Sequence, residues 1–249
     1  MHKKRLLGFT VVLGMMALLV GCTADFSNVR LFNLGNISGS GAVVSHDFDV
    51  ENFNALDISG NYLITWRQSD EVSVTVSMQE NLFEFLEVSV QSETLVIDAM
   101  RTFNIGHANR PRIDITSPYL EMIRTSGAVY ISDWDSINAQ HFSIHAAGAA
   151  NITLSLAVDS FEAHLAGAGD LTLSGNATEV NMTLAGAGNI EATHLQTNQA
   201  DIVLTGAGNI DVAVSDYLTV NLTGAGRVRY TGNPTIERNI LGAGRLEQQ

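Results

Sequence analysis

The chain has 249 residues, with 13 basic and 26 acidic side chains and a formal net charge of −13 at pH 7. So acidic a protein is a poor partner for nucleic acid or for an anionic membrane surface, because both attractions need exposed lysine and arginine. The only cysteine is Cys22, which excludes an intrachain disulfide, so the fold must be held by its core.

The chain begins with the pattern of a bacterial export signal. A basic start at residues 3–5 precedes an apolar run, Leu6–Val20, that is too short for a typical membrane-spanning helix. The sequence Leu18–Cys22 resembles a lipobox, in which the cysteine receives a diacylglycerol and becomes the first residue of the mature protein. We therefore expect residues 1–21 to be a lipoprotein signal peptide and Cys22 to be lipidated. The alternative is an ordinary secretory signal with an incidental cysteine.

Lipidation at Cys22 predicts an exported protein anchored in the cell membrane or the outer membrane, facing the periplasm or the cell exterior. Thr23 follows the cysteine, so the commonest inner-membrane retention signal, an aspartate, is missing if the envelope is Gram-negative. Residues 22–48 are rich in Asn, Ser and Gly with little periodicity, which predicts a tether between the lipid and a domain over residues 49–249.

Strands are predicted between residues 50 and 122, where apolar and polar residues alternate with a period of two. The segment Glu80–Leu86 predicts a short helix or turn, and residues 99–110 predict a loop. Ser59-Gly60-Asn61 resembles Ser126-Gly127-Ala128 and is a candidate first copy of the repeat described next. The pattern leaves open whether this segment forms irregular coils of the same solenoid or a separate cap.

From residue 127 the pair Gly-Ala recurs at steps of 18 to 21 residues, the spacing of a solenoid. The copies begin at Gly127, Gly148, Gly167, Gly186, Gly206, Gly224 and Gly242. Positions two and four before the glycine, and four after it, are mostly apolar, whereas their neighbours are mostly polar. Since side chains alternate across a strand, each copy predicts a strand, a glycine corner and a second strand. The fold class is all-β, a single-stranded β-helix with coils of about 18 to 21 residues.

The corner residues have a structural interpretation. A sharp corner between stacked coils needs φ values or close approaches that a Cβ would obstruct, so the glycines are structural. We also expect the alanine after each glycine to fill a narrow seam between coils. These residues are Ala128, Ala149, Ala168, Ala187, Ala207, Ala225 and Ala243.

The strands and corners together resemble a known family. The resemblance is carried by Phe53–Trp66, Val72–Val76, Leu95–Ile97, Ile113–Leu120 and the Gly-Ala-Gly copies, over roughly residues 50–246. They are similar to the auto-transporter adhesin, head GIN domain family. The resemblance implies an exported bacterial protein, often a lipoprotein, built as a right-handed β-helix. The adhesin role comes with the family name, and the family brings no catalytic residues.

No metal or cofactor site is predicted. A calcium roll at Gly167–Leu171 would need several oxygen ligands for each ion, and the column holding Asp170 is otherwise Tyr, Asn and Arg. No helix follows the glycines, which excludes a dinucleotide fingerprint. His145 and His164 fall in one outward column and could form a weak metal pair, but two solvated histidines are the preferred interpretation.

Many β-helices are polysaccharide lyases or hydrolases, so an enzyme is weighed against a binding protein. The candidate carboxylates are Asp170 and a pair on adjacent coils, Glu191 and Asp211, which a scatter of surface carboxylates explains better. No serine or cysteine is set beside a histidine at a recognisable spacing, so no catalytic residues are assigned.

The last coils carry outward arginines. Arg227, Arg229 and Arg245 form a candidate anion-binding patch for a glycan, a lipid headgroup or a carboxylate-rich partner, with salt links to Glu237 and Glu247 as the alternative. The final coil has an open edge that allows self-association.

The leading functional hypothesis is a lipid-anchored, non-enzymatic envelope protein that binds glycans or envelope proteins through a polar face, with no nucleic-acid partner and no cofactor. The alternatives are a carbohydrate-active β-helix enzyme and a structural or sensory envelope component that binds another protein.

Overall fold

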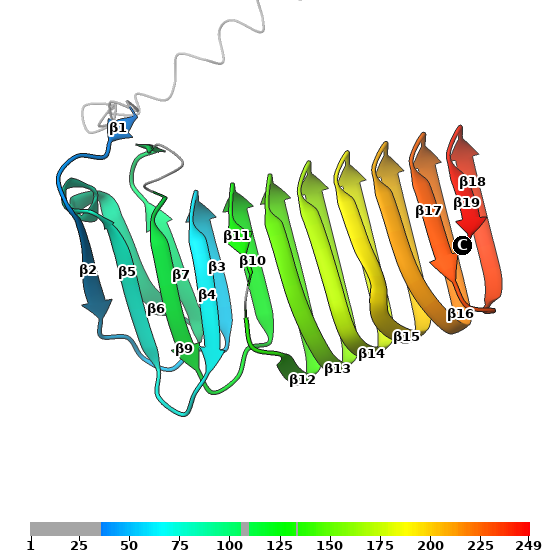
Figure 1. Ribbon diagram of the computed structural model, residues 1–249, viewed down its shortest axis with the longest axis horizontal. Helices are drawn as coiled ribbons and strands as arrows, with labels where there is room; N and C mark the ends of the chain where they lie inside the picture. Colours follow the sequence, from blue (N-terminus) through cyan, green and yellow to red (C-terminus); the bar gives the residue numbers. More distant parts are fainter. Residues whose placement is uncertain (1–35, 106–109, 133) are drawn as a thin grey trace, which may run out of the picture. The chain divides into compact units, whose positions relative to one another are not determined.

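Glycine corners and parallel strands organise the protein in the computed structural model, which describes residues 36–105, 110–132 and 134–249 (Figure 1). The expected signal peptide, Cys22 and the first part of the expected tether lie outside the described residues. The fold is a β-solenoid of about 7 turns with about 19 residues per turn, which confirms the predicted fold class. Within the described residues, no helix combines the length and apolar character needed to span a membrane.

The regular part of the solenoid consists of parallel strands in register. Its strands are β10 (Met122–Gly127), β11 (Tyr130–Ile131), β12 (Ile137–Gly148), β13 (Asn151–Gly167), β14 (Asp170–Gly186), β15 (Asn189–Gly206), β16 (Asn209–Gly224), β17 (Arg227–Thr231), β18 (Thr235–Gly242) and β19 (Arg245–Gln248). Each long strand runs from one glycine corner, round a bend, to the next corner (Figure 1). We call the stacked segments before the corners the upstream sheet and those after the corners the downstream sheet.

The glycine at each corner is required for two physical reasons. Gly186 has a φ of +141°, and a Cβ placed there would lie 2.1 Å from the carbonyl oxygen of Gly167 in the coil below. That carbonyl accepts a hydrogen bond from the backbone N–H of Ala187 at 2.9 Å, so the close approach is also the bond that ties two coils together. A side chain at this position would therefore both strain the backbone and separate the coils.

The prediction for the corner alanines is wrong. Ala128 is half-buried and the six later ones are exposed, so they do not fill a seam. The inward position is the next one, where five of the seven copies carry a second glycine. At Gly208 a Cβ would lie 2.7 Å from Leu184 Cδ2, which shows that the narrow space is here. The alternation of period two continues through the corner and turns the alanine outward.

The first copy of the repeat lies before the region of regular spacing. Strands β3 (Ala55–Gly60) and β4 (Leu63–Gln68) pair in parallel with β10 and β11, and Gly60 stacks directly on Gly127. The interpretation of Ser59-Gly60-Asn61 as a first copy is confirmed. The 3-10 helix η2 (Glu80–Phe85) likewise confirms the predicted short helix.

The rest of the segment before residue 122 forms a cap of mixed strands. Its strands are β2 (Val43–Phe48), β5 (Ser73–Gln79), β6 (Leu86–Gln91), β7 (Thr94–Ala99) and β9 (Arg112–Ser117). β7 and β9 continue the two sheets in parallel below the β3–β4 coil, whereas β5, β6 and β2 add antiparallel strands. A separate short sheet joins β1 (Ile37–Ser38) to β8 (Phe103–Asn104). Strand β2 lies within residues assigned to the tether, so ordered β structure begins before residue 49.

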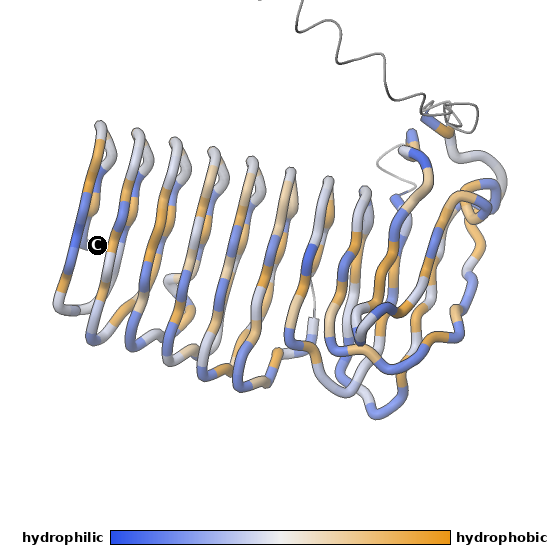
Figure 2. Tube along the Cα trace, turned by 180° about the vertical axis from the view of Figure 1, so that it is seen from behind, coloured by the Kyte–Doolittle hydropathy of each residue, from blue (hydrophilic) through white to orange (hydrophobic). Residues whose placement is uncertain are grey.

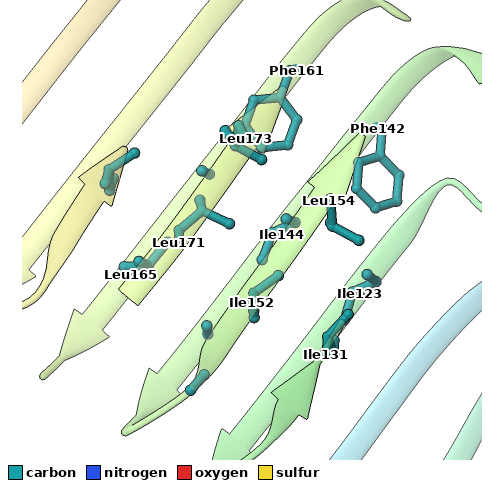
Figure 3. Packing of buried hydrophobic residues seen from close by; sticks show 14 of the residues in the cluster. Ile123, Ile131, Phe142, Ile144, Ile152, Leu154, Phe161, Leu165, Leu171 and Leu173 are labelled. Atoms are coloured by element: carbon teal, nitrogen blue, oxygen red, sulfur yellow. The ribbon is translucent and has the colours of Figure 1, made fainter. Parts of the chain in front are cut away.

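One continuous core fills the space between the two sheets. The inward columns predicted from the sequence are buried through most coils, as at Ile144, Leu184 and Ile190. Figure 3 shows buried side chains of successive coils, among them Ile144, Ile152 and Leu171. The rings of Phe142 and Phe161 are stacked at a centroid distance of 6.2 Å. Apolar and polar residues alternate along every coil in Figure 2, which is the pattern that the sequence carries.

Candidate functional site

The outer face of the downstream sheet is occupied by hydrogen bonds and ion pairs between coils. In the column three residues after the corner glycine, Asn209 Nδ2 donates to Asn189 Oδ1 at 2.9 Å and Asn189 Nδ2 donates to Asp170 Oδ1 at 2.8 Å. In this ladder each side chain forms a hydrogen bond with the equivalent side chain of the neighbouring coil. Asp170 is therefore part of a ladder of side-chain hydrogen bonds between coils.

The predicted arginine patch is divided between internal partners and solvent. Arg229 forms a bidentate ion pair with Asp211, which is only 6% exposed. Arg227 Nε lies 3.5 Å from a carboxylate oxygen of Glu247. The alternative of a salt link to Glu247 is thus observed for Arg227. Arg245 stacks on Arg227 in register, with its side chain exposed. The pKa of Arg229 is raised by its hydrogen bond to Asp211.

Two of the three candidate catalytic carboxylates lie beside each other in the downstream sheet. Glu191 and Asp211 do stack on adjacent coils, as the spacing predicted. However, Asp211 is bound by Arg229, and Glu191 Oε1 accepts a hydrogen bond from the hydroxyl of Thr193. Both carboxylates already have internal partners.

The two histidines of the upstream sheet form a stacked pair. The rings of His145 and His164 lie 5.0 Å apart between centroids at an interplanar angle of 18°, and His164 Nε2 is 2.6 Å from Glu162 Oε1. Burial, followed by the neighbouring His164, lowers the pKa of His145, and the hydrogen bond to His164 lowers the pKa of Glu162. Among the described residues, no group of three His, Cys, Asp or Glu side chains is placed to hold a metal ion.

A polar surface lies on the upstream sheet of β14, β15 and β16. A groove of about 210 Å³ runs across these three coils, and we call it the Tyr217 groove. Its outward side chains come from two columns, and they are Glu179, Asn181, Gln199, Asp201, Tyr217 and Thr219. Tyr217 is 57% exposed, which is unusual for a large aromatic side chain on this surface.

The groove differs from the ladder on the opposite sheet because its polar side chains are not paired with one another. No hydrogen bond or ion pair joins these six side chains to any part of the chain that the structure describes. Their amide and carboxylate groups are free to bind a ligand. The sequence predicted a polar face in general but not this groove, although Tyr217 stands out as an aromatic residue in an otherwise polar column.

The fold and this surface define a class of protein: a capped parallel β-solenoid with an open polar face. Residues 52–234 match the model of the family described as "putative auto-transporter adhesin, head GIN domain". The chain belongs to this family, which confirms the resemblance seen in the sequence.

Several solved structures share the fold. A "putative adhesin" from Bacteroides fragilis is 25% identical, with a TM-score of 0.79 over 86% of this chain and 100% of its own. A "putative lipid binding protein" from Parabacteroides distasonis is 22% identical, with a TM-score of 0.71 over the same shares. A "putative adhesin" from Parabacteroides merdae is 19% identical, with a TM-score of 0.70 over 86% of this chain and 99% of its own. No curated protein matches the sequence.

Proposed function

We propose that this protein is a lipid-anchored envelope protein whose β-solenoid is a non-enzymatic adhesin that binds neutral glycans in the Tyr217 groove. The observation that carries the proposal is the coincidence of an exposed aromatic ring with unpaired amide and carboxyl groups in one groove. Family membership supports the adhesin class.

Glycans fit this surface better than other ligands for chemical reasons. A sugar ring has an apolar face that packs on an aromatic ring and hydroxyl groups that both donate and accept hydrogen bonds. Coils repeat every ~4.8 Å, so equivalent side chains recur at intervals close to the length of one sugar ring. Glu179 and Asp201 make the groove acidic, which disfavours anionic polysaccharides.

A glycan array probed with the full chain in detergent tests the proposal. Tyr217→Ala should weaken binding to neutral glycans at least tenfold, and Asn181→Ala should weaken it less, because it removes hydrogen bonds but leaves the aromatic surface. The matched control is Tyr119→Ala, which removes a tyrosine that is also exposed, at 50%, but lies on the cap. Equal binding by the parent and Tyr217→Ala would contradict the proposal.

The same preparation separates an adhesin from an enzyme. Incubation with a polysaccharide library should release no new reducing or unsaturated ends. Release that is abolished by Asp170→Asn or Asp211→Asn would replace the adhesin proposal with a carbohydrate-active enzyme.

The anchor is tested separately in cells fed labelled palmitate. The parent should carry label and sediment with membranes, whereas Cys22→Ser should lose both properties. Cross-linking and pull-down of the labelled protein would identify an envelope protein as the ligand if glycans do not bind.

A further inference from the structure

The regular stacking of corners stops at Gly60, and a pocket lies where it stops. From Gly127 onward each corner is hydrogen-bonded to the corner below it. The Ala149 N–H donates to the Gly127 carbonyl at 2.9 Å, and the Ala128 N–H donates to the Gly60 carbonyl at 2.8 Å. Strand β7 follows β3 only as far as the pair Ile97 and Ile58. The chain then leaves the stack, and β9 joins the other sheet at Arg112. The level below Gly60 therefore has no corner.

The pocket at this point has a volume of about 360 Å³. One side is the backbone of two corners, at Gly60 and Gly127, which carry no side chains. The other side is the segment that leaves the stack, with Phe103 and Ala99 as apolar surface and Asp98 and Arg101 as charged groups. A mainly apolar hollow with a few convergent polar groups is the usual form of a small-ligand site.

Tyr62 supplies a buried donor that nothing in the described chain uses. Tyr62 is one of the residues that line the pocket, it is fully buried, and its hydroxyl has no hydrogen-bond partner among the described residues. Burial, reinforced by the negative charge of Asp98, raises the pKa of Tyr62 well above its usual range, so the hydroxyl keeps its proton. Leaving such a group unpaired is costly, and a ligand acceptor would remove that cost.

The two charges of the pocket are also available. Arg101 lies over the ring of Phe85 at 5.4 Å, and no ion pair joins it to Asp98 in the described chain. Asp98 Oδ1 accepts the backbone N–H of Ala99 at 2.8 Å, which leaves its other oxygen free. Asn61 Oδ1 accepts from Arg110 Nε at 2.9 Å, which leaves the Asn61 amide free to donate.

We infer that this pocket binds a single neutral sugar ring. Its donors are Tyr62, Asn61 and Arg101, and its main acceptor is Asp98, so the ligand must both donate and accept hydrogen bonds. The negative charge of Asp98 repels an anion and the positive charge of Arg101 repels a cation, whereas neutral hydroxyl groups can form hydrogen bonds with both side chains. Phe103 offers an apolar surface to the face of the ring. The inference rests on the proposed glycan-binding function, because the pocket would hold a terminal residue of the same ligand class at a second place on the protein.

The test is saturation-transfer NMR on the full chain in detergent, titrated with glucose, galactose, mannose and N-acetylglucosamine at millimolar concentrations. At least one sugar should bind saturably. Tyr62→Phe and Asp98→Asn should each weaken binding about tenfold, the effect of one hydrogen bond. Tyr62→Phe should melt no lower than the parent, because the lost hydroxyl has no internal partner. This separates a ligand contact from a loss of folding.

Tyr217→Ala is the matched control and should leave monosaccharide binding unchanged. Absence of binding by all four sugars, or equal binding by the parent and both pocket variants, would overturn the inference. If Tyr217→Ala still weakens binding on the glycan array at least tenfold in that case, the proposed function survives without this pocket. If array binding is also insensitive to Tyr217→Ala, both fail.

Discussion

The first glycine of each corner is subject to two structural constraints at one backbone position. Its positive φ would strain any other residue, and its Cα hydrogen faces the carbonyl of the coil below. Gly41 shows that the two effects can be separated, since it has a φ of +86° but no atom within 4 Å of a Cβ placed there. Positive φ and close approach should therefore be measurable independently.

We predict that Gly186→Ala lowers the free energy of unfolding by about 3 kcal/mol or more, because it combines backbone strain with a clash against a backbone carbonyl. Gly41→Ala should cost about 1 kcal/mol, the strain alone. Ala187→Ser, at the exposed neighbour, should stay within about 0.5 kcal/mol of the parent. Urea denaturation followed by circular dichroism measures all three. Equal losses for Gly186→Ala and Ala187→Ser would contradict the corner geometry.

The inward and outward columns make a second residue-scale prediction. Leu184 is 1% exposed, so Leu184→Asp should prevent folding and Leu184→Ala should cost about 3 kcal/mol. Asn189→Ser should cost only about 1 kcal/mol, because it removes the ladder bonds to Asp170 and Asn209 from an exposed side chain. The same denaturation measurement applies. A soluble, cooperatively unfolding Leu184→Asp protein would refute the inward column.

At the scale of elements, parallel strands in register place equivalent residues of successive coils beside one another. This contact is stabilising for some side chains and destabilising for others. The asparagine ladder gains hydrogen bonds from the stacking, whereas His145 and His164 are brought together as two groups that both accept protons. The cost of charging such a pair makes the contact between β12 and β13 sensitive to acid.

We predict that stability falls as the pH is lowered from 7 to 5. The pKa of His145 is below its ordinary value of 6.5 in the folded protein, through burial, His164 and Arg124, so the unfolded chain takes up the proton first and folding loses free energy below that value. The pKa of Glu162 is also lowered, so the stability that its carboxylate contributes to the fold is lost as the pH falls below the ordinary pKa range of a glutamate. The two effects have the same sign.

Urea midpoints at pH 5, 6, 7 and 8 measure the dependence. His145→Gln should flatten the decline between pH 7 and 5, since the substituted side chain does not titrate, and His194→Gln is the control at an exposed histidine on another coil. An unchanged slope in His145→Gln would show that the decline comes from other groups.

The strands that follow the repeat and the alternation of apolar and polar residues can be predicted from the sequence. Strand pairing between distant segments cannot. The repeat period and the apolar columns follow from alternation at Ile144, Leu184 and Ile190. The cap is not predictable in this way, because the antiparallel pairing of β5 with β9 joins segments without a common repeat. The prediction for Ala187 was wrong because it took the small size of the side chain as a sign of a narrow space around it. The Tyr217 groove could be suspected from its aromatic residue, but its unpaired side chains become evident only in three dimensions.

At the scale of the whole described unit, the two ends of the stack are protected differently. The first coil, β3 and β4, pairs with the cap strands β7 and β9, to which the cap adds antiparallel strands. By contrast, β18 and β19 pair on one side only within the described residues. Ile236 is 38% exposed there, although its column is buried in earlier coils. Arg238 aligns with the buried Val220 yet is itself exposed, so a charge occupies an inward position at the open edge. Inward-pointing charges of this kind discourage edge-to-edge pairing.

We predict that Arg238→Leu strengthens association of two copies through this edge. The change removes a guanidinium that would have to be desolvated and adds apolar surface worth about 2 kcal/mol on burial, which corresponds to roughly a thirtyfold rise in the association constant. Sedimentation equilibrium of the full chain in detergent measures it. Asn239→Leu places the same side chain on the outward column and should leave association unchanged. If both variants associate equally, general surface hydrophobicity is responsible; if Arg238→Leu matches the parent, Arg238 does not guard the edge.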